Sequence, residues 1–182
     1  MSRVAAGFSI REAAQADAAA IARVHTESWR TTYAGILPRE LIARESGTKS
    51  ELVWQRRLAR PARGAATWIA ETPREGIVGF ATCGEARDPI EGLDAEIYAL
   101  YVIHSHQRRG VGRELVRACA RHFVRQGLFS FYLWVLKANR ARLFYDAMGG
   151  EEVATRNERL GLHRYDEIAY GWRDLTGLVT PD

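Results

Sequence analysis

The sequence predicts a single α/β domain, residues 1–182, built around one mixed sheet. Strand and helix patterns alternate along most of the chain, which is typical of that class. A nearly continuous apolar run, Phe129 to Leu136, indicates a strand buried on both faces. A length of 182 residues, with 47% hydrophobic and 26% charged side chains, is typical of one soluble globular domain. We expect the element order β-α-α-β-β-β-α-β-α-β-β.

The first elements are a short strand and a long helix. Phe8 to Arg11 has a strand pattern. From Asp17 to Tyr33 the pattern is helical, with Ile21, Val24 and Ser28 on one stripe and many alanines around them.

Two more helical stretches precede the next strands. Pro38 suits the first position of a helix that runs to Ser46, and Gly47 suits its stop signal. Ser50 to Ala59 continues in helical pattern. Together these stretches form the helical segment between the first and second strands.

A hairpin and a loop come next. Ala66–Glu71 and Ile77–Cys83 are strand patterns joined by a tight turn with proline and glycine. Glu85 to Leu93 contains Pro89 and Gly92, and we expect it to be a loop.

The middle of the chain joins a strand, a glycine loop and a helix. Glu96 to Ile103 is rich in β-branched and aromatic residues, and Gln107 to Gly112 is a short basic loop with two glycines. An apolar stripe at four-residue steps then predicts a helix that ends at Gly127. Its members are Val111, Leu115, Cys119 and Phe123.

The last predicted elements are a helix and two strands. Asn139 to Met148 has a helical pattern, and Asn139 suits its N-cap. Val153–Arg156 and Tyr165–Trp172 are strand patterns that we expect to pair antiparallel.

The glycine loop at the start of a helix indicates a phosphate site. Glycine permits close backbone approach, and the first N–H groups of a helix have no intrahelical partner. No Gly-Lys-Ser/Thr ends the loop, so it is not a P-loop. Leu115 stands where the dinucleotide fingerprint requires its third glycine, so that class is excluded as well.

The string Gln107-x-x-Gly110-x-Gly112, directly after Leu100-Tyr101-Val102, resembles the acyl-CoA-binding motif of the GNAT superfamily of N-acetyltransferases. The resemblance covers nearly the whole chain. The segment from Ser28 to Pro38, of pattern SWRxxYxGILP, resembles the substrate-side helices of one bacterial branch, and Asp166 to Trp172 resembles the last strand. The family fold implies a central strand that splays away from its neighbour.

The resemblance implies acetyl-CoA as co-substrate and a set of residues that bind it. The main chain of the central strand would pair with pantetheine, and the loop would hold the pyrophosphate. An asparagine and a phenylalanine of the later helix complete the implied set. These residues are Leu100, Tyr101, Val102, Gln107, Arg108, Arg109, Gly110, Val111, Gly112, Arg113, Asn139 and Phe144.

Two residues are candidates for proton transfer. Glu96 is a carboxylate at the start of an apolar strand, where partial burial would suit a general base. A strand-end glutamate that pairs with an arginine or faces solvent is the alternative. By resemblance, Tyr145 would protonate the leaving thiolate; otherwise it is a core tyrosine. Trp29, Tyr33 and Trp54 could line an acceptor pocket, or belong to the core or a dimer surface.

We therefore expect an N-acetyltransferase in which a primary amine attacks the thioester directly, with a small-molecule acceptor preferred. The alternatives are a protein N-terminal or lysine acetyltransferase and a non-catalytic CoA-binding sensor. Neither cysteine, Cys83 or Cys119, lies in a nucleophile motif. A homodimer through a C-terminal edge strand is an open option.

Other partners are not expected. The net charge of +4 and pI near 9.3 would suit nucleic acid, but the arginines are dispersed, and an acidic co-substrate explains a basic loop equally well. The histidines and cysteines lack metal-ligand spacing, so we expect no metal. No apolar run is long enough for a membrane helix and no secretory signal begins the chain, which predicts the cytoplasm.

Overall fold

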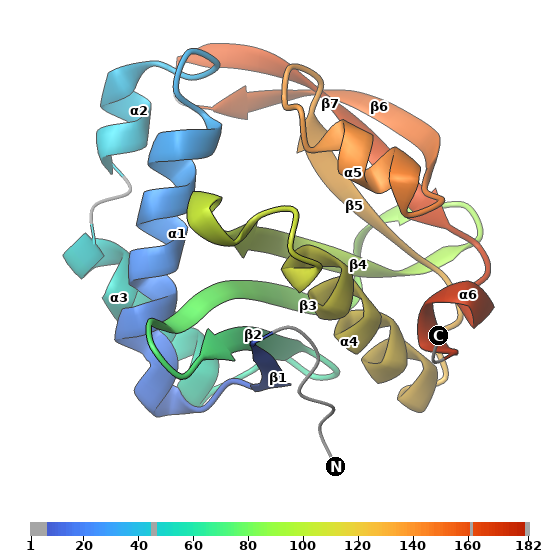
Figure 1. Cartoon of the computed structure of the whole chain (residues 1–182). Helices are drawn as coiled ribbons and strands as arrows, with labels where there is room; N and C mark the ends of the chain where they lie inside the picture. The colour runs from blue at the N-terminus through green and yellow to red at the C-terminus, as the bar shows by residue number, and fades with distance from the viewer. Residues whose placement is uncertain (1–6, 45–46, 161, 181–182) are drawn as a thin grey trace.

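The computed structural model describes residues 7–44, 47–160 and 162–180 (Figure 1). Its core is one seven-stranded mixed sheet in the order β1-β2-β3-β4-β5-β7-β6. The strands are β1 (Ser9–Glu12), β2 (Ala66–Thr72), β3 (Gly76–Ile90), β4 (Leu93–Val102), β5 (Phe131–Leu136), β6 (Glu151–Leu160) and β7 (His163–Trp172). The helices are α1 (Ala18–Thr32), α2 (Arg39–Arg44), α3 (Gly47–Ala59), α4 (Val111–Arg125), α5 (Arg142–Ala147) and α6 (Thr176–Val179), with 3₁₀ turns η1 (Gln15–Asp17) and η2 (His104–His106).

The mixed α/β fold class is confirmed, with differences in detail. Three helices precede β2, in agreement with the three predicted helical stretches, although the expected element order counted only two; α6 follows the last strand. Gly47 begins α3 and does not stop the preceding helix, while the predicted end at Ser46 lies outside the described residues. The C-terminal edge strand is β6, and β7 lies inside the sheet beside β5.

The predicted loop from Glu85 to Leu93 is wrong. β3 continues to Ile90 and β4 begins at Leu93, so the segment forms the end of a hairpin with an irregular register between Glu85 and Ile90. Tertiary hydrogen bonds hold the hairpin, because Tyr98 Oη donates to Glu85 O at 2.7 Å and Tyr132 Oη donates to Asp88 O at 2.6 Å. Turn-forming residues predicted a loop, and contacts with distant residues made it a strand.

Helices cover both faces of the sheet. A Cβ on Gly79 of β3 would lie 3.3 Å from Leu115 of α4, whereas the next residue, Phe80, packs against Trp54 of α3 and His25 of α1. Because successive side chains of a strand point to opposite faces, α4 lies on one face and α1 with α3 on the other. The predicted apolar stripe of α4 is confirmed as buried, from Val111 to Phe123.

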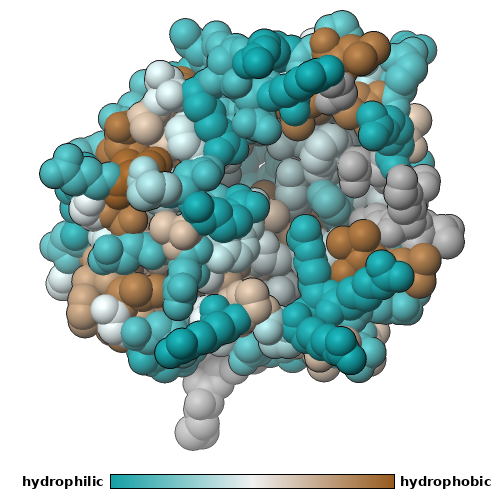
Figure 2. Space-filling model, turned by 180° about the vertical axis from the view of Figure 1, so that it is seen from behind, coloured by the Kyte–Doolittle hydropathy of each residue, from teal (hydrophilic) through white to brown (hydrophobic). Residues whose placement is uncertain are grey.

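The decisive feature of the sheet is the separation of β4 and β5. These parallel strands pair only at Ala95 with Phe131 and at Glu96 with Tyr132, although β4 continues to Val102 and β5 to Leu136. Figure 1 shows the two strands diverging, and Figure 2 shows a hollow near the middle of the opposite face. The predicted splay of the central strand is therefore confirmed.

Among the described residues, no helix combines the length and the apolar composition needed to cross a bilayer.

Gly150 lies in close contact with the indole of Trp172, and this contact yields a stability prediction. A Cβ at Gly150 would stand 2.6 Å from Trp172 Cζ2, and Trp172 is held by its Nε1 donating to Met148 O at 3.0 Å. We expect Gly150→Ala to lower the free energy of unfolding by about 1–3 kcal/mol, because the core cannot expand there without strain. Urea denaturation measures this. Gly177→Ala is the control, because nothing lies within 4 Å of its added Cβ. An unchanged urea midpoint for Gly150→Ala would contradict the packing argument.

Candidate active site

The separation of β4 from β5 leaves main-chain groups of β4 without a strand partner on that side. Ile103 N donates to Val78 O of β3 at 3.0 Å. The N–H and C=O groups of the odd-numbered residues at this end of β4 therefore face β3. Because the direction of N–H and C=O groups alternates along a strand, Leu100 and Val102 direct theirs toward β5. The structure thus places two of the three predicted strand residues with backbone groups facing the gap, although Val102 O accepts from Gln107 Nε2, whereas Tyr101 pairs with Phe80 of β3.

The glycine loop and the start of α4 lie at the end of this gap. Gly110 adopts a left-handed conformation with φ 85°, and Arg108 does so with φ 58°. These dihedrals let the chain turn sharply from the loop into α4. The first helical bond runs from Glu114 N to Gly110 O at 3.0 Å, so within the described part of the chain the N–H groups from Arg108 to Arg113 have no backbone partner and are available to a ligand.

Charged side chains and close packing surround the start of α4. The side chains of Arg108, Arg109 and Arg113 are exposed and add positive charge to the N-terminal end of the helix dipole. Gln107 Nε2 donates to Val102 O at 3.0 Å, which ties the loop to the strand. A Cβ on Gly112 would lie 3.3 Å from Cζ of Phe144, so α5 approaches the first turn of α4 closely. This arrangement is suited to a pyrophosphate group.

Two of the predicted site residues lie at α5: Asn139 just before the helix, and Tyr145 on it. The helix begins at Arg142, three residues later than predicted, and Asn139 caps the turn before it through Oδ1, which accepts from Ala141 N at 2.9 Å. The side-chain NH₂ group of Asn139 can donate to a ligand. Tyr145 is buried, and its ring lies between Tyr170 and Trp172 with centroids 5.6 and 6.4 Å away.

Three tyrosines from three elements converge where β4 and β5 separate. The hydroxyls of Tyr33, after α1, and Tyr101, on β4, lie 3.3 Å apart. Burial raises the pKa of Tyr145 far above its ordinary value, and the nearby Tyr33 adds to the rise. Burial likewise raises the pKa of Tyr101, with Tyr33 contributing. All these phenols are therefore protonated donors at neutral pH.

An aromatic wall stands behind the tyrosines. Trp29 packs on Tyr33 at 4.8 Å between centroids, and His25 on Tyr101 at 5.1 Å. Burial lowers the pKa of His25 to about 4, with Arg57 adding to the effect, so this ring is neutral at pH 7. Trp54 is 2% exposed and lies beneath His25, so it belongs to the core under this wall. Direct contact between Trp54 and an acceptor stays a prediction.

Glu96 stands at the point where the strands part, and it has a close partner. Its carboxylate is 1% exposed and accepts from Arg87 through Nη2 at 2.5 Å, Nε at 3.0 Å and the backbone N at 3.1 Å. Tyr132 Oη lies 3.3 Å from Glu96 Oε2. The ion pair with Glu96 raises the pKa of Arg87 further. An arginine partner was the predicted alternative to a base for Glu96, and the structure shows that Glu96 has one.

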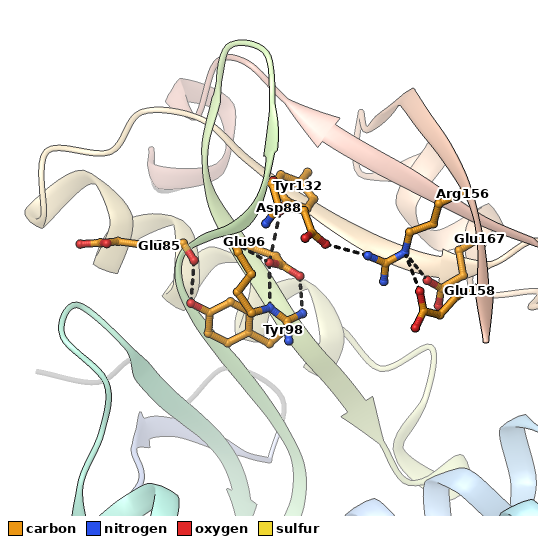
Figure 3. A network of polar contacts seen from close by, with 9 residues as sticks. Glu85, Asp88, Glu96, Tyr98, Tyr132, Arg156, Glu158 and Glu167 are labelled. Atoms are coloured by element: carbon orange, nitrogen blue, oxygen red, sulfur yellow. Dashed lines mark hydrogen bonds and ion pairs between the residues drawn. The ribbon is translucent and has the colours of Figure 1, made fainter. Parts of the chain in front are cut away.

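A second ionic group lies further along the same face (Figure 3). Arg156 of β6 packs over the Trp134 ring at 4.1 Å. Its guanidinium pairs with Glu167 at 2.7 Å, Asp88 at 2.8 Å and Glu158 at 3.9 Å. None of these residues, nor Arg87, was singled out from the sequence. Glu167 was visible only as a carboxylate near the middle of a strand pattern.

Family comparison agrees with this geometry. The model of the acetyltransferase (GNAT) family matches residues 21–149, which include most of α1, all of β4, the glycine loop and Tyr145. The chain belongs to the acetyltransferase (GNAT) family. A Bacillus subtilis (strain 168) protein named "Uncharacterized N-acetyltransferase YuaI" is 35% identical over 172 residues, covering 94% of this chain and 96% of that protein.

Two solved GNAT-like structures have the same fold. A GCN5-related N-acetyltransferase from Rhodopseudomonas palustris aligns with a TM-score of 0.69 and 21% identity, covering 89% of this chain and 92% of its own. The protein yncA from Salmonella typhimurium, solved with acetyl-CoA, aligns with a TM-score of 0.68 and 22% identity, covering 97% of this chain and 98% of its own.

The described residues of the present chain contain no group of three or more His, Cys, Asp or Glu side chains placed to hold a metal ion.

The close approach of α5 to Gly112 gives a prediction for co-substrate binding. We expect Gly112→Ala to raise the Kd for acetyl-CoA about tenfold, because the new Cβ presses on Phe144 and shifts the first turn of α4. Isothermal titration calorimetry measures this. Gly177→Ala is again the matched control, since it makes the same change in a helix far along the chain. Equal Kd values for both variants would contradict a role for this turn in binding.

Proposed function

We propose that this GNAT protein transfers an acetyl group from acetyl-CoA to a small-molecule primary amine. The observation that carries the proposal is the parting of β4 and β5 after Glu96, with free peptide groups along β4 and unpaired helix N–H groups at its end. An extended chain ending in phosphates fits such a gap as an added strand.

The residues that would hold the co-substrate follow from this geometry. Leu100 and Val102 offer main-chain groups to the pantetheine, while the backbone from Arg108 to Arg113 and its three arginines hold the phosphates. Asn139 would donate through its side chain, and Phe144 would pack beside the bound molecule. Gln107 fixes the loop to β4.

The proposed reaction is direct attack within a ternary complex. Glu96 is the proposed acceptor of the first proton, which the ammonium loses to become a neutral amine. The amine nitrogen bonds to the acetyl carbon, the carbon–sulfur bond breaks, and the sulfur leaves with a proton donated by Tyr145. The nitrogen then loses its second proton, which restores the Tyr145 hydroxyl and leaves the neutral amide. A covalent acetyl-cysteine is disfavoured, because Cys83 and Cys119 are buried and burial raises the pKa of the Cys119 thiol.

The wall around Tyr33 supports a small acceptor. Trp29, Tyr33 and Tyr101 present rigid, partly exposed rings, and the two tyrosine hydroxyls lie together, which suits a compact ligand. The segment from Ser28 to Pro38 that supplies this wall is the one that we assign to a bacterial branch of the family. A protein N-terminus or a lysine remains the second candidate acceptor, and a non-catalytic CoA sensor the third.

A thiol-release assay with acetyl-CoA and a panel of primary amines and short peptides tests the proposal. Amine-dependent release with a mass gain of one acetyl group on a small amine is the expected result. Acetylation of peptides alone would move the acceptor to the protein class. Calorimetric binding of acetyl-CoA without turnover would indicate a sensor, and absence of binding would overturn the assignment of the gap.

A further inference from the structure

The candidate acceptor side of the gap ends in a group of carboxylates that the proposed chemistry does not use. Glu167 pairs in register with Leu136, the last residue of β5, and therefore lies level with the end of β5 that no longer pairs with β4. Its side chain is 14% exposed. It is on the same face of the sheet as Trp134, because Glu167 and Ala169 are two residues apart on β7 and Ala169 pairs with Trp134. Glu96 is on that face too, because it pairs with Tyr132, two residues before Trp134.

The carboxylate of Glu167 is only partly neutralised. Its bond to Arg156 Nε falls on Oε2, and among the described residues no hydrogen bond reaches Oε1. Arg156 also pairs with Asp88 and Glu158, so one guanidinium serves three carboxylates. The local charge of this group, taken over these four side chains, is therefore −2.

The charge of Glu167 acts on Tyr33. Burial raises the pKa of Tyr33, and Glu167 adds to the rise. The Tyr33 hydroxyl lies 3.3 Å from that of Tyr101. Figure 1 shows the start of β7 next to the connection between α1 and α2, which carries Tyr33. The aromatic wall and the carboxylates thus border one site from two sides.

We propose that Glu167 binds a positive charge on the acceptor, so that the preferred substrate is a short aliphatic primary amine carrying a second cationic group. This rests on the proposed acetyl transfer. The reacting amine lies at Tyr33 and Tyr101, and the second cation lies at Glu167 Oε1. A carboxylate that is mostly buried and incompletely paired attracts a cation strongly, while an anionic acceptor would be repelled by the same group.

Three amines with four carbon atoms each test the inference: 1,4-diaminobutane, butylamine and 4-aminobutyrate. The expected order of kcat/KM for the wild type is diamine, then butylamine, then the amino acid, with about 30-fold or more between the first two. Glu167→Gln should remove most of the preference for the diamine over butylamine. Glu158→Gln is the matched control, because it removes a carboxylate from the same arginine at its most distant contact, 3.9 Å. The control should keep the preference.

Outcomes for the inference and for the enzyme assignment are separable. Equal use of the three amines by the wild type, or an unchanged preference in Glu167→Gln, would overturn the inference and leave acetyl transfer intact. If none of the amines is acetylated, isothermal titration calorimetry measures whether 1,4-diaminobutane binds to the CoA-loaded protein. Binding that is lost in Glu167→Gln supports the site, whereas no binding, or equal binding by the variant, refutes it. Failure to bind CoA would instead refute the proposed function.

Discussion

Replacing Tyr145 with phenylalanine is expected to lower kcat by about 100-fold or more while leaving the Kd for acetyl-CoA nearly unchanged. The phenol is buried where β4 and β5 part, and its raised pKa keeps it protonated over the working pH range. The substitution keeps the ring that packs on Tyr170 and Trp172 and removes only the proton donor. Steady-state kinetics with acetyl-CoA, together with calorimetric titration, separates the two effects.

Tyr170→Phe provides the matched control for Tyr145. Its ring lies 5.6 Å from that of Tyr145, but its hydroxyl donates to Glu152 at 3.1 Å, away from the gap. This variant should keep kcat within about threefold, with some loss of stability. If both variants lose activity equally, the effect is one of packing. If Tyr145→Phe retains full kcat, the leaving thiolate obtains its proton from another source.

Replacing Glu96 with glutamine is expected to lower kcat/KM by about 100-fold and to remove the rise of activity that a base produces with increasing pH. The structure offers a second explanation for any loss, because Glu96 also holds Arg87 and through it the end of the β3–β4 hairpin. Activity at one pH cannot separate these roles. A full pH profile of kcat/KM can.

Arg87→Gln is the companion variant that separates a base from an anchor. It breaks the same ion pair and leaves a carboxylate that is 1% exposed without its cation. If Glu96 is the base, the ascending limb of the pH profile persists in Arg87→Gln, which keeps the carboxylate, and is lost in Glu96→Gln. If Glu96 only anchors the hairpin, both variants keep the same ascending limb. Both then lose about 2 kcal/mol of folding free energy, because the ion pair is broken while Arg87 is 58% exposed.

Local patterns in the sequence were sufficient for the scaffold of the site. The strand over Glu96–Ile103, the loop at Gln107–Gly112 and the apolar stripe from Val111 to Phe123 were all predicted, and the structure has β4, the turn and α4 in those places. Periodicity and glycine positions are properties of a few consecutive residues, so one sequence can reveal them. The order and type of the main elements followed from the same signals.

Only the tertiary structure decided which side chains lie next to one another at the candidate site. Arg87 reaches Glu96 because the expected loop is a hairpin, and Asp88, Arg156 and Glu167 meet although 68 residues separate the first two. Tyr33 reaches Tyr101 across a similar separation. Strand pairing depends on contacts between distant segments, which compete with and override local turn signals. The sequence by itself therefore determined the strand, loop and helix start of the proposed co-substrate site, whereas the proposed acceptor side, with its charge, depended on the folded sheet.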